Sequence, residues 1–102
     1  MEISIDYNKF YGVNVYYNIV KTYTNGNDFV GYIIYVGKPC IIAHTDKYSV
    51  KMLREILRLF SMFGKDVIAE IPSDYLYDFW SKHYSIKIWN KNMKLYRITE
   101  RK

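Results

Sequence analysis

The sequence predicts an α+β domain built on a twisted, mixed sheet, and three observations support this prediction. The chain has 102 residues, which is enough for one hydrophobic core and leaves no room for a second domain. Polar and apolar side chains alternate through much of the N-terminal half, which is the period of β-strands. After Thr45 the apolar period becomes helical, and strand-like and helix-like segments then follow one another. We therefore expect one domain over residues 1–102, in the order β-β-β-β-α-β-α-β-β.

The N-terminal half is expected to form four strands in an antiparallel meander. The alternation places them at residues 2–6, 10–24, 29–36 and 40–45. Asn25-Gly26 stands between the second and third strands and is a strong signal for a two-residue hairpin turn. The third strand is apolar on both faces, as expected for a central strand. The next turn is predicted at Gly37-Lys38-Pro39.

The C-terminal half is expected to combine two helices with three strands. Helical spacing of apolar residues runs from Val50 to Phe63, with Asp46 or Ser49 as the candidate cap and Gly64 as the end. Ser73 is predicted to cap a second, shorter helix. Strands are predicted at residues 66–71, 85–89 and 93–99. Helix–strand alternation predicts one right-handed parallel crossover, with the other strands antiparallel.

The composition narrows the class of protein. Cys40 is the only cysteine, so no internal disulfide can form, and neither a signal-like segment nor an apolar run of about 20 residues occurs. We expect a cytoplasmic protein that does not bind membranes. The two histidines and one cysteine show no metal-ligand spacing. Abundant Lys, Asn, Ile and Tyr with little Ala are typical of AT-rich coding sequence, as found in phages, for which the compartment would be the host cytoplasm.

Two short patterns near the C-terminus resemble a known family. Phe79-Trp80-Ser81-Lys82 is similar to the Phe-Tyr-x-Lys pattern of a late helix in the GNAT superfamily of N-acetyltransferases. Met93-Lys94-Leu95-Tyr96 is similar to the last strand of that family. The predicted element order over residues 10–99 also resembles it. The resemblance implies a GNAT-like fold and, in an active member, acetyl-CoA as cofactor.

Three departures from the family pattern argue against ordinary acetyl transfer. Only residues 7–9 separate the first two predicted strands, where the family has two helices that shape the acceptor site. The family's glycine-rich loop holds the CoA pyrophosphate through backbone N–H groups, whereas residues 45–50 contain no glycine and include Asp46. Trp80 stands where the family has its general-acid tyrosine. The resemblance thus implies a scaffold that lacks the two N-terminal helices and the cofactor loop.

An active acyltransferase remains the first alternative, and it assigns roles to four residues. His44, at the end of the fourth predicted strand, would act as general base. Lys47, Ser49 and Lys51 would hold phosphate at the helix N-terminus in place of the glycine loop. The ordinary interpretation of His44 is a side chain that caps or packs.

Basic residues suggest a second alternative, a nucleic-acid-binding protein. The net charge is +5, and Lys47, Lys51, Arg54 and Arg58 recur on one side of the long helix. This stripe is either a surface for phosphates or an acidic partner, or only the solvent face of an amphipathic helix. A second basic group comprises Lys87, Lys91, Lys94, Arg97, Arg101 and Lys102. Tyr84 and Tyr96 are interleaved with that group, an arrangement that can bind single strands.

Tyrosines on the predicted sheet form the favoured class of site. Tyr16, Tyr17, Tyr32 and Tyr35 lie on neighbouring predicted strands, and without the two missing helices one sheet face is less covered. Exposed apolar and aromatic surface of this kind indicates a partner or a self-interface. An exposed strand edge would also permit a homodimer.

These observations lead to one functional hypothesis. We expect a non-enzymatic protein-interaction module without a cofactor, contacting its partner through these tyrosines and the basic stripe. If the chain is phage-encoded, the expected partner is a host or defence protein that it inhibits. A divergent acetyl-CoA-dependent N-acetyltransferase and a basic nucleic-acid-binding protein are the alternatives.

Overall fold

The computed structural model describes residues 19–35, 37–64 and 66–101. Its strands are β1 (Val20–Asn25), β2 (Asp28–Tyr35), β3 (Lys38–His44), β4 (Asp66–Glu70), β5 (Tyr84–Asn90) and β6 (Leu95–Glu100). Its helices are α2 (Val50–Phe63) and α3 (Asp74–Ser81). The strand predicted at 2–6 and most of the strand predicted at 10–24 lie outside the described residues.

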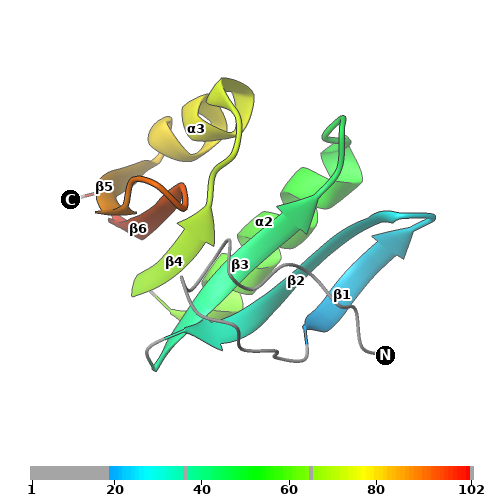
Figure 1. Cartoon of the computed structure of the whole chain (residues 1–102), viewed down its shortest axis with the longest axis horizontal. Coiled ribbons are helices and arrows are strands. Elements are labelled where there is room, and N and C mark those ends of the chain that lie inside the picture. The colour runs from blue at the N-terminus through cyan, green and yellow to red at the C-terminus, as the bar shows by residue number, and fades with distance from the viewer. Residues whose placement is uncertain (1–18, 36, 65, 102) are drawn as a thin grey trace.

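The described strands form one six-stranded sheet in the order β1-β2-β3-β4-β6-β5 (Figure 1). β3 and β4 are parallel, and all other neighbouring strands in this sheet are antiparallel. Helix α2 connects β3 to β4, so it forms the predicted parallel crossover. The predicted α+β class with a mixed sheet is confirmed.

Local capping explains where the helices begin. The Ser49 Oγ accepts a hydrogen bond from the Met52 N–H at 3.2 Å, so Ser49 rather than Asp46 caps α2. Gly64, with φ of 96°, follows the last residue of the helix. Ser73 caps α3 in the same way, by accepting from the Leu76 N–H at 3.2 Å. The caps fix the positions of the two loops that precede these helices.

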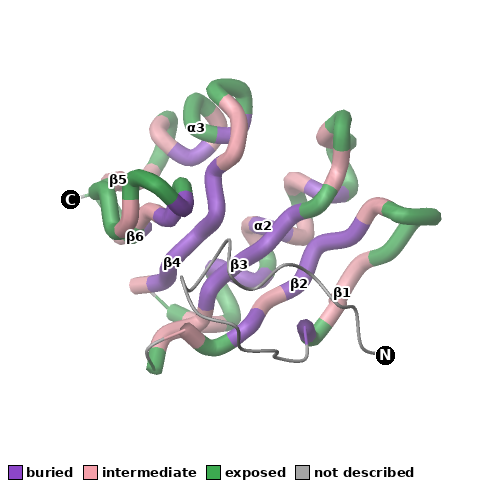
Figure 2. Tube along the Cα trace, in the orientation of Figure 1, coloured by how far each residue is buried: buried purple, intermediate pink, exposed green. Residues whose placement is uncertain are grey.

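Both helices pack on the same face of the sheet. The buried residues of this helix side include Met52, Ile56, Leu59 and Phe60 of α2, Leu76 and Trp80 of α3, and Val30, Ile41, Val67 and Ile98 of the strands. A second buried cluster lies on the opposite face and includes Phe29, Ile33, Cys40, Ile42, Ile68 and Leu95. Figure 2 shows β4 and most of β3 as buried. The central strands therefore carry buried apolar residues on both faces of the sheet.

Two turns differ from the prediction by one or two residues. Asn25 pairs with Asp28, so the first hairpin loop is Gly26-Asn27 and not Asn25-Gly26. Gly26 has φ of 62°, which suits glycine at the first central position of the turn. Tyr35 pairs with Lys38, so Lys38 and Pro39 begin β3 instead of belonging to a turn. Proline is tolerated there because it stands near the start of the strand.

Candidate functional site

Strands β3 and β4 separate toward their C-terminal ends (Figure 1). Their parallel pairing joins Cys40 to Ile68 and Ile41 to Ala69. Beyond these pairs a cavity of about 560 Å³ opens between the loops that follow the two strands. It is lined by Thr45, Asp46, Lys47, Tyr48, Pro72, Ser73 and Tyr75. We call this cavity the strand-end cleft, and such a position at the carboxyl ends of parallel strands is a common ligand site.

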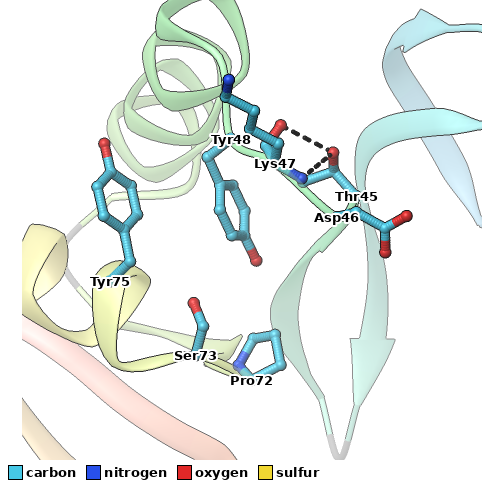
Figure 3. Close-up of a pocket in the computed structure, with 7 residues that line it drawn as sticks. All are labelled: Thr45, Asp46, Lys47, Tyr48, Pro72, Ser73 and Tyr75. Atoms are coloured by element: carbon cyan, nitrogen blue, oxygen red, sulfur yellow. Dashed lines mark hydrogen bonds between the residues drawn. The ribbon is translucent and has the colours of Figure 1, made fainter.

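Two tyrosine rings form much of the wall of the strand-end cleft (Figure 3). The rings of Tyr48 and Tyr75 are 6.1 Å apart between centroids and nearly parallel, at 16°. The Tyr48 hydroxyl is buried and points toward Ser73, without hydrogen-bond geometry to any described residue. Burial raises the pKa of Tyr48, the charge of Glu70 raises it further, and the nearby Ser73 hydroxyl offsets part of this rise. The Tyr48 hydroxyl is thus protonated and uncharged, and its ring lines the strand-end cleft.

Polar groups in the loop after β3 form hydrogen bonds with one another. The Thr45 Oγ1 accepts a hydrogen bond from the Lys47 N–H at 3.0 Å and donates one to the Lys47 carbonyl at 2.9 Å. The Met52 N–H, in the first turn of α2, donates to Ser49. Two backbone N–H groups beside the cleft are therefore engaged within the chain.

The strand-end cleft does not fit the cofactor that the family resemblance implies. A pyrophosphate needs free N–H groups and a positive field, whereas the N–H groups of Lys47 and Met52 have acceptors. Asp46 lines the same cavity as Lys47, so their charges oppose each other. The Tyr48 ring also takes up space among the residues that line this cavity (Figure 3). We therefore derive no chemistry through acetyl-CoA.

The structure separates the residues predicted to act in catalysis and cofactor binding. Of Lys47, Ser49 and Lys51, Lys47 lines the cleft, Ser49 caps α2, and Lys51 is exposed on that helix. His44 is exposed, and its ring stacks on Phe29 at 5.4 Å between centroids. Because Phe29 belongs to the cluster on the face opposite the helices, His44 also lies on that face. Its contact matches the packing interpretation.

Trp80, at the position of the family's general-acid tyrosine, is a core residue. It is 1% exposed and belongs to the helix-side cluster. Its ring meets Phe60 at 5.7 Å and Tyr84 at 5.5 Å, both edge to face. Trp80 therefore contributes to packing between α2, α3 and β5.

The basic stripe on α2 is partly neutralised. Arg54 and Arg58 are exposed, as is Lys51. Arg58 donates two hydrogen bonds to Glu55, at 2.8 and 2.6 Å, and this pairing lowers the pKa of Glu55. Lys51, Arg54 and Arg58 thus form a solvent-exposed face of α2 in which Arg58 is paired within the helix, whereas Lys47 lies in the loop before α2.

The predicted tyrosine surface is not formed by Tyr32 and Tyr35. The two residues are three positions apart on β2, so they point to opposite faces of the sheet. The Tyr32 ring meets Phe63 of α2 at 4.6 Å, on the helix side. Tyr35 packs against the cluster on the other face. Tyr16 and Tyr17 lie outside the described residues.

Another exposed surface lies beside β5, where the sequence predicted the second basic group with Tyr84 and Tyr96 but no apolar contact surface. Tyr77 of α3 meets Tyr96 of β6 at 5.6 Å, and Tyr96 pairs with Ile88 of β5. Tyr77 is 40% exposed, Ile88 65% and Trp89 37%. We call Tyr77, Ile88 and Tyr96 the edge patch, because each of the three contacts or pairs with another. The apolar residues at the end of β5 are its only sequence signal, because a strand pattern does not show whether a neighbour covers it.

No family model, curated protein or solved structure matches this chain. Among the described residues, no helix is long and apolar enough to span a membrane. The same residues contain no group of three or more His, Cys, Asp or Glu side chains that could hold a metal ion. The fold and its surfaces therefore define the protein as an α+β domain with a partly filled cleft and an exposed apolar patch at one sheet edge.

Proposed function

We propose that the protein is a non-enzymatic protein-interaction module on an acetyltransferase-like scaffold, with the edge patch as its contact surface. The observation that carries this proposal is that the exposed side chains of Tyr77 and Ile88 both adjoin Tyr96, beside the edge strand β5 of the described sheet. Exposed apolar side chains that lie together at one place are characteristic of surfaces that bind a partner. Aromatic residues are also enriched in protein interfaces.

The chemistry of the strand-end cleft supports binding over acyl transfer. A general base must lie within hydrogen-bond reach of the proton that it removes, but His44 is outside the cleft lining and stacks on Phe29. The acid position is occupied by the buried Trp80. The Tyr48 ring is part of the lining of the cleft. On the phage hypothesis, the partner is a host or defence protein.

Partner capture with matched variants tests the proposal. The wild-type chain, Ile88→Ser and Met62→Ser would each be used to capture proteins from the host, and captured proteins would be purified for titration. Ile88 and Met62 are both exposed apolar residues, at 65% and 52%, but Met62 lies on α2. We expect Ile88→Ser to weaken binding by about tenfold or more, as for a contact worth about 1.4 kcal/mol. A partner that binds both variants as tightly as wild type would contradict the proposal.

A ligand titration tests the acyltransferase alternative. A ligand that binds only the folded state stabilises it by about 2.7 kcal/mol at 100 times its dissociation constant, which raises Tm by several degrees. We expect no shift with millimolar acetyl-CoA or CoA. A clear shift, together with turnover that depends on His44, would replace the present proposal with a divergent acyltransferase.

A further inference from the structure

The hairpin formed by β5 and β6 is strongly basic. Residues 84–100, which form β5, β6 and the turn between them, contain Lys87, Lys91, Lys94 and Arg97, and Glu100 is their one acidic residue. Three of these cations are exposed lysines, and the fourth, Arg97, pairs with Asp66 of β4 at 2.7 Å. This end of the sheet therefore offers positive charge to any partner.

The same hairpin supplies the edge of the described sheet. Strand β5 pairs with β6 on one side, and no other described strand pairs with it. Its outer side therefore presents backbone N–H and C=O groups that can pair with another extended chain. Ile88, the most exposed residue of the edge patch, and the exposed Lys87 are neighbours on this strand.

Pairing of this edge with a second copy of the chain is disfavoured. Pairing β5 with β5 brings together two basic hairpins, and like charges placed opposite each other are destabilising. The pairing with β6 is also interrupted by a bulge between Ile88 and Asn90. A central lysine and a bulge are both features that protect edge strands from self-association. The same lysine would attract a partner strand of opposite charge.

Single-stranded nucleic acid matches fewer of these features. Phosphates could contact the lysines, but they would leave the backbone edge of β5 unpaired. The exposed Tyr77 ring could stack on a base, but such stacking would use neither Ile88 nor the backbone groups of β5. A polypeptide, in contrast, supplies backbone groups, carboxylates and apolar side chains together.

We propose that the β5 edge takes up an extended, acidic segment of the partner protein as an additional strand. An apolar side chain of this segment lies against Ile88 and Tyr96, and its carboxylates face Lys87 and Lys91. Backbone hydrogen bonds supply affinity, and the alternation of side chains supplies specificity. This inference rests on the proposed function and specifies the chemistry of the partner.

A synthetic peptide of alternating valine and glutamate residues tests this mode of binding. The probe is fluorescently labelled and titrated with the full-length protein at low ionic strength. Two control peptides carry lysine in place of glutamate, or N-methyl groups on alternate backbone nitrogens along one edge. We expect the acidic peptide to bind, the lysine peptide not to bind, and N-methylation to weaken binding by about tenfold or more, because several hydrogen bonds are lost. Hydrogen exchange of β5 amides should slow only with the unmodified acidic peptide.

Two charge reversals provide the matched protein controls. Lys87→Glu changes the edge strand, whereas Lys21→Glu makes the same change on β1, at the opposite edge of the described sheet. We expect Lys87→Glu to weaken binding by about tenfold or more and Lys21→Glu by about twofold or less, as for local rather than long-range charge effects. Equal loss in both variants would show a general charge effect and overturn the inference.

Three further outcomes overturn this inference: no binding at millimolar peptide, equal binding of the N-methylated peptide, or stronger binding of an oligothymidine probe at this edge. A dimer in which β5 amides are protected would do the same. None of these results affects the capture experiment, in which Ile88→Ser can still abolish binding to a folded partner. If a partner is lost on Ile88→Ser but the peptide does not bind, the interaction function stands and strand addition does not.

Discussion

Arg97 of β6 and Asp66 of β4 form a bidentate ion pair. The Arg97 Nε lies 2.9 Å from the Asp66 Oδ1, and the Nη2 lies 2.7 Å from the Oδ2. Lys38 of β3 reaches the same carboxylate at 2.9 Å. One aspartate thus links three neighbouring strands. These contacts, with Arg97 first and Lys38 second, lower the pKa of Asp66 to about 2 from an ordinary value of 3.8.

The first prediction concerns this carboxylate and pH. Because its pKa is lower in the folded state than in the unfolded state, its contribution to stability is present above about pH 4 and is lost as pH falls through about 2. The side chain is 34% exposed, so solvent screening limits the loss in Asp66→Asn to about 1 kcal/mol or less at neutral pH. Urea unfolding should show this difference at pH 7 and not at pH 2. Asp78→Asn, on the exposed side of α3, is the control, and a difference that is equal at both pH values would contradict the assignment.

The second prediction contrasts the two tryptophans. Trp80 is 1% exposed in the core, whereas Trp89 is 37% exposed near the end of β5. Trp80→Ala should cost about 3–5 kcal/mol of unfolding free energy, and Trp80→Phe a smaller amount that keeps the protein folded. Trp89→Ala should change stability by about 0.5 kcal/mol or less. Guanidinium unfolding measures all three, and the expected order is wrong if Trp89→Ala is the most damaging.

The third prediction concerns Gly31 in the middle of β2. A Cβ at this position would contact the Val20 carbonyl oxygen of β1 too closely for either backbone to remain in place. Gly31→Ala should therefore destabilise the protein by about 1–3 kcal/mol, as for an overpacked site. Gly26→Ala tests a different cost, because its Cβ meets open space but its φ is 62°; about 1 kcal/mol is expected. Hydrogen exchange should separate them, with Gly31→Ala loosening the β1–β2 pairing. Normal protection of these strands in Gly31→Ala would exclude the clash.

The fourth prediction concerns the Tyr48 hydroxyl. A buried hydroxyl without good hydrogen-bond geometry contributes little, so Tyr48→Phe should leave stability unchanged or raise it by up to about 1 kcal/mol. Tyr48→Ala also removes the ring that stacks on Tyr75 and should be clearly less stable. Chemical denaturation measures both. A loss of more than about 1 kcal/mol in Tyr48→Phe would reveal a functional hydrogen bond to Ser73.

The sequence predicted the elements well because their signals are local. Ser49 and Ser73 begin the helices with side chains that bond to backbone three residues ahead, and Gly64 ends α2. The period of apolar residues then assigns each segment to strand or helix. The hairpin at Gly26 was misplaced by one residue because Asn25-Gly26 and Gly26-Asn27 are both good turn sequences.

The candidate sites were predicted less well because they depend on pairing across the fold. Tyr32 and Tyr35 belong to one strand but to opposite faces, and α2 covers the first of them. His44 is one residue from the cleft lining, yet the alternation of β3 turns it to the other side. The exposure of Ile88 depends on β5 being the last strand of the described sheet, and the order β4-β6-β5 cannot be seen in any local pattern.

The narrow pairing of β3 with β4 divides the sheet into two sets of three strands. Each set is held by antiparallel pairing between close neighbours in the chain, apart from β4 with β6. Between the sets, backbone pairing is confined to Cys40–Ile68 and Ile41–Ala69 in the described part. The two buried clusters and the Lys38–Asp66 contact also join the sets. The described sheet therefore consists of two three-stranded halves that are joined by a short parallel pairing. Under mechanical force or heating, the parallel pairing of β3 with β4 should break before the antiparallel pairings within either half.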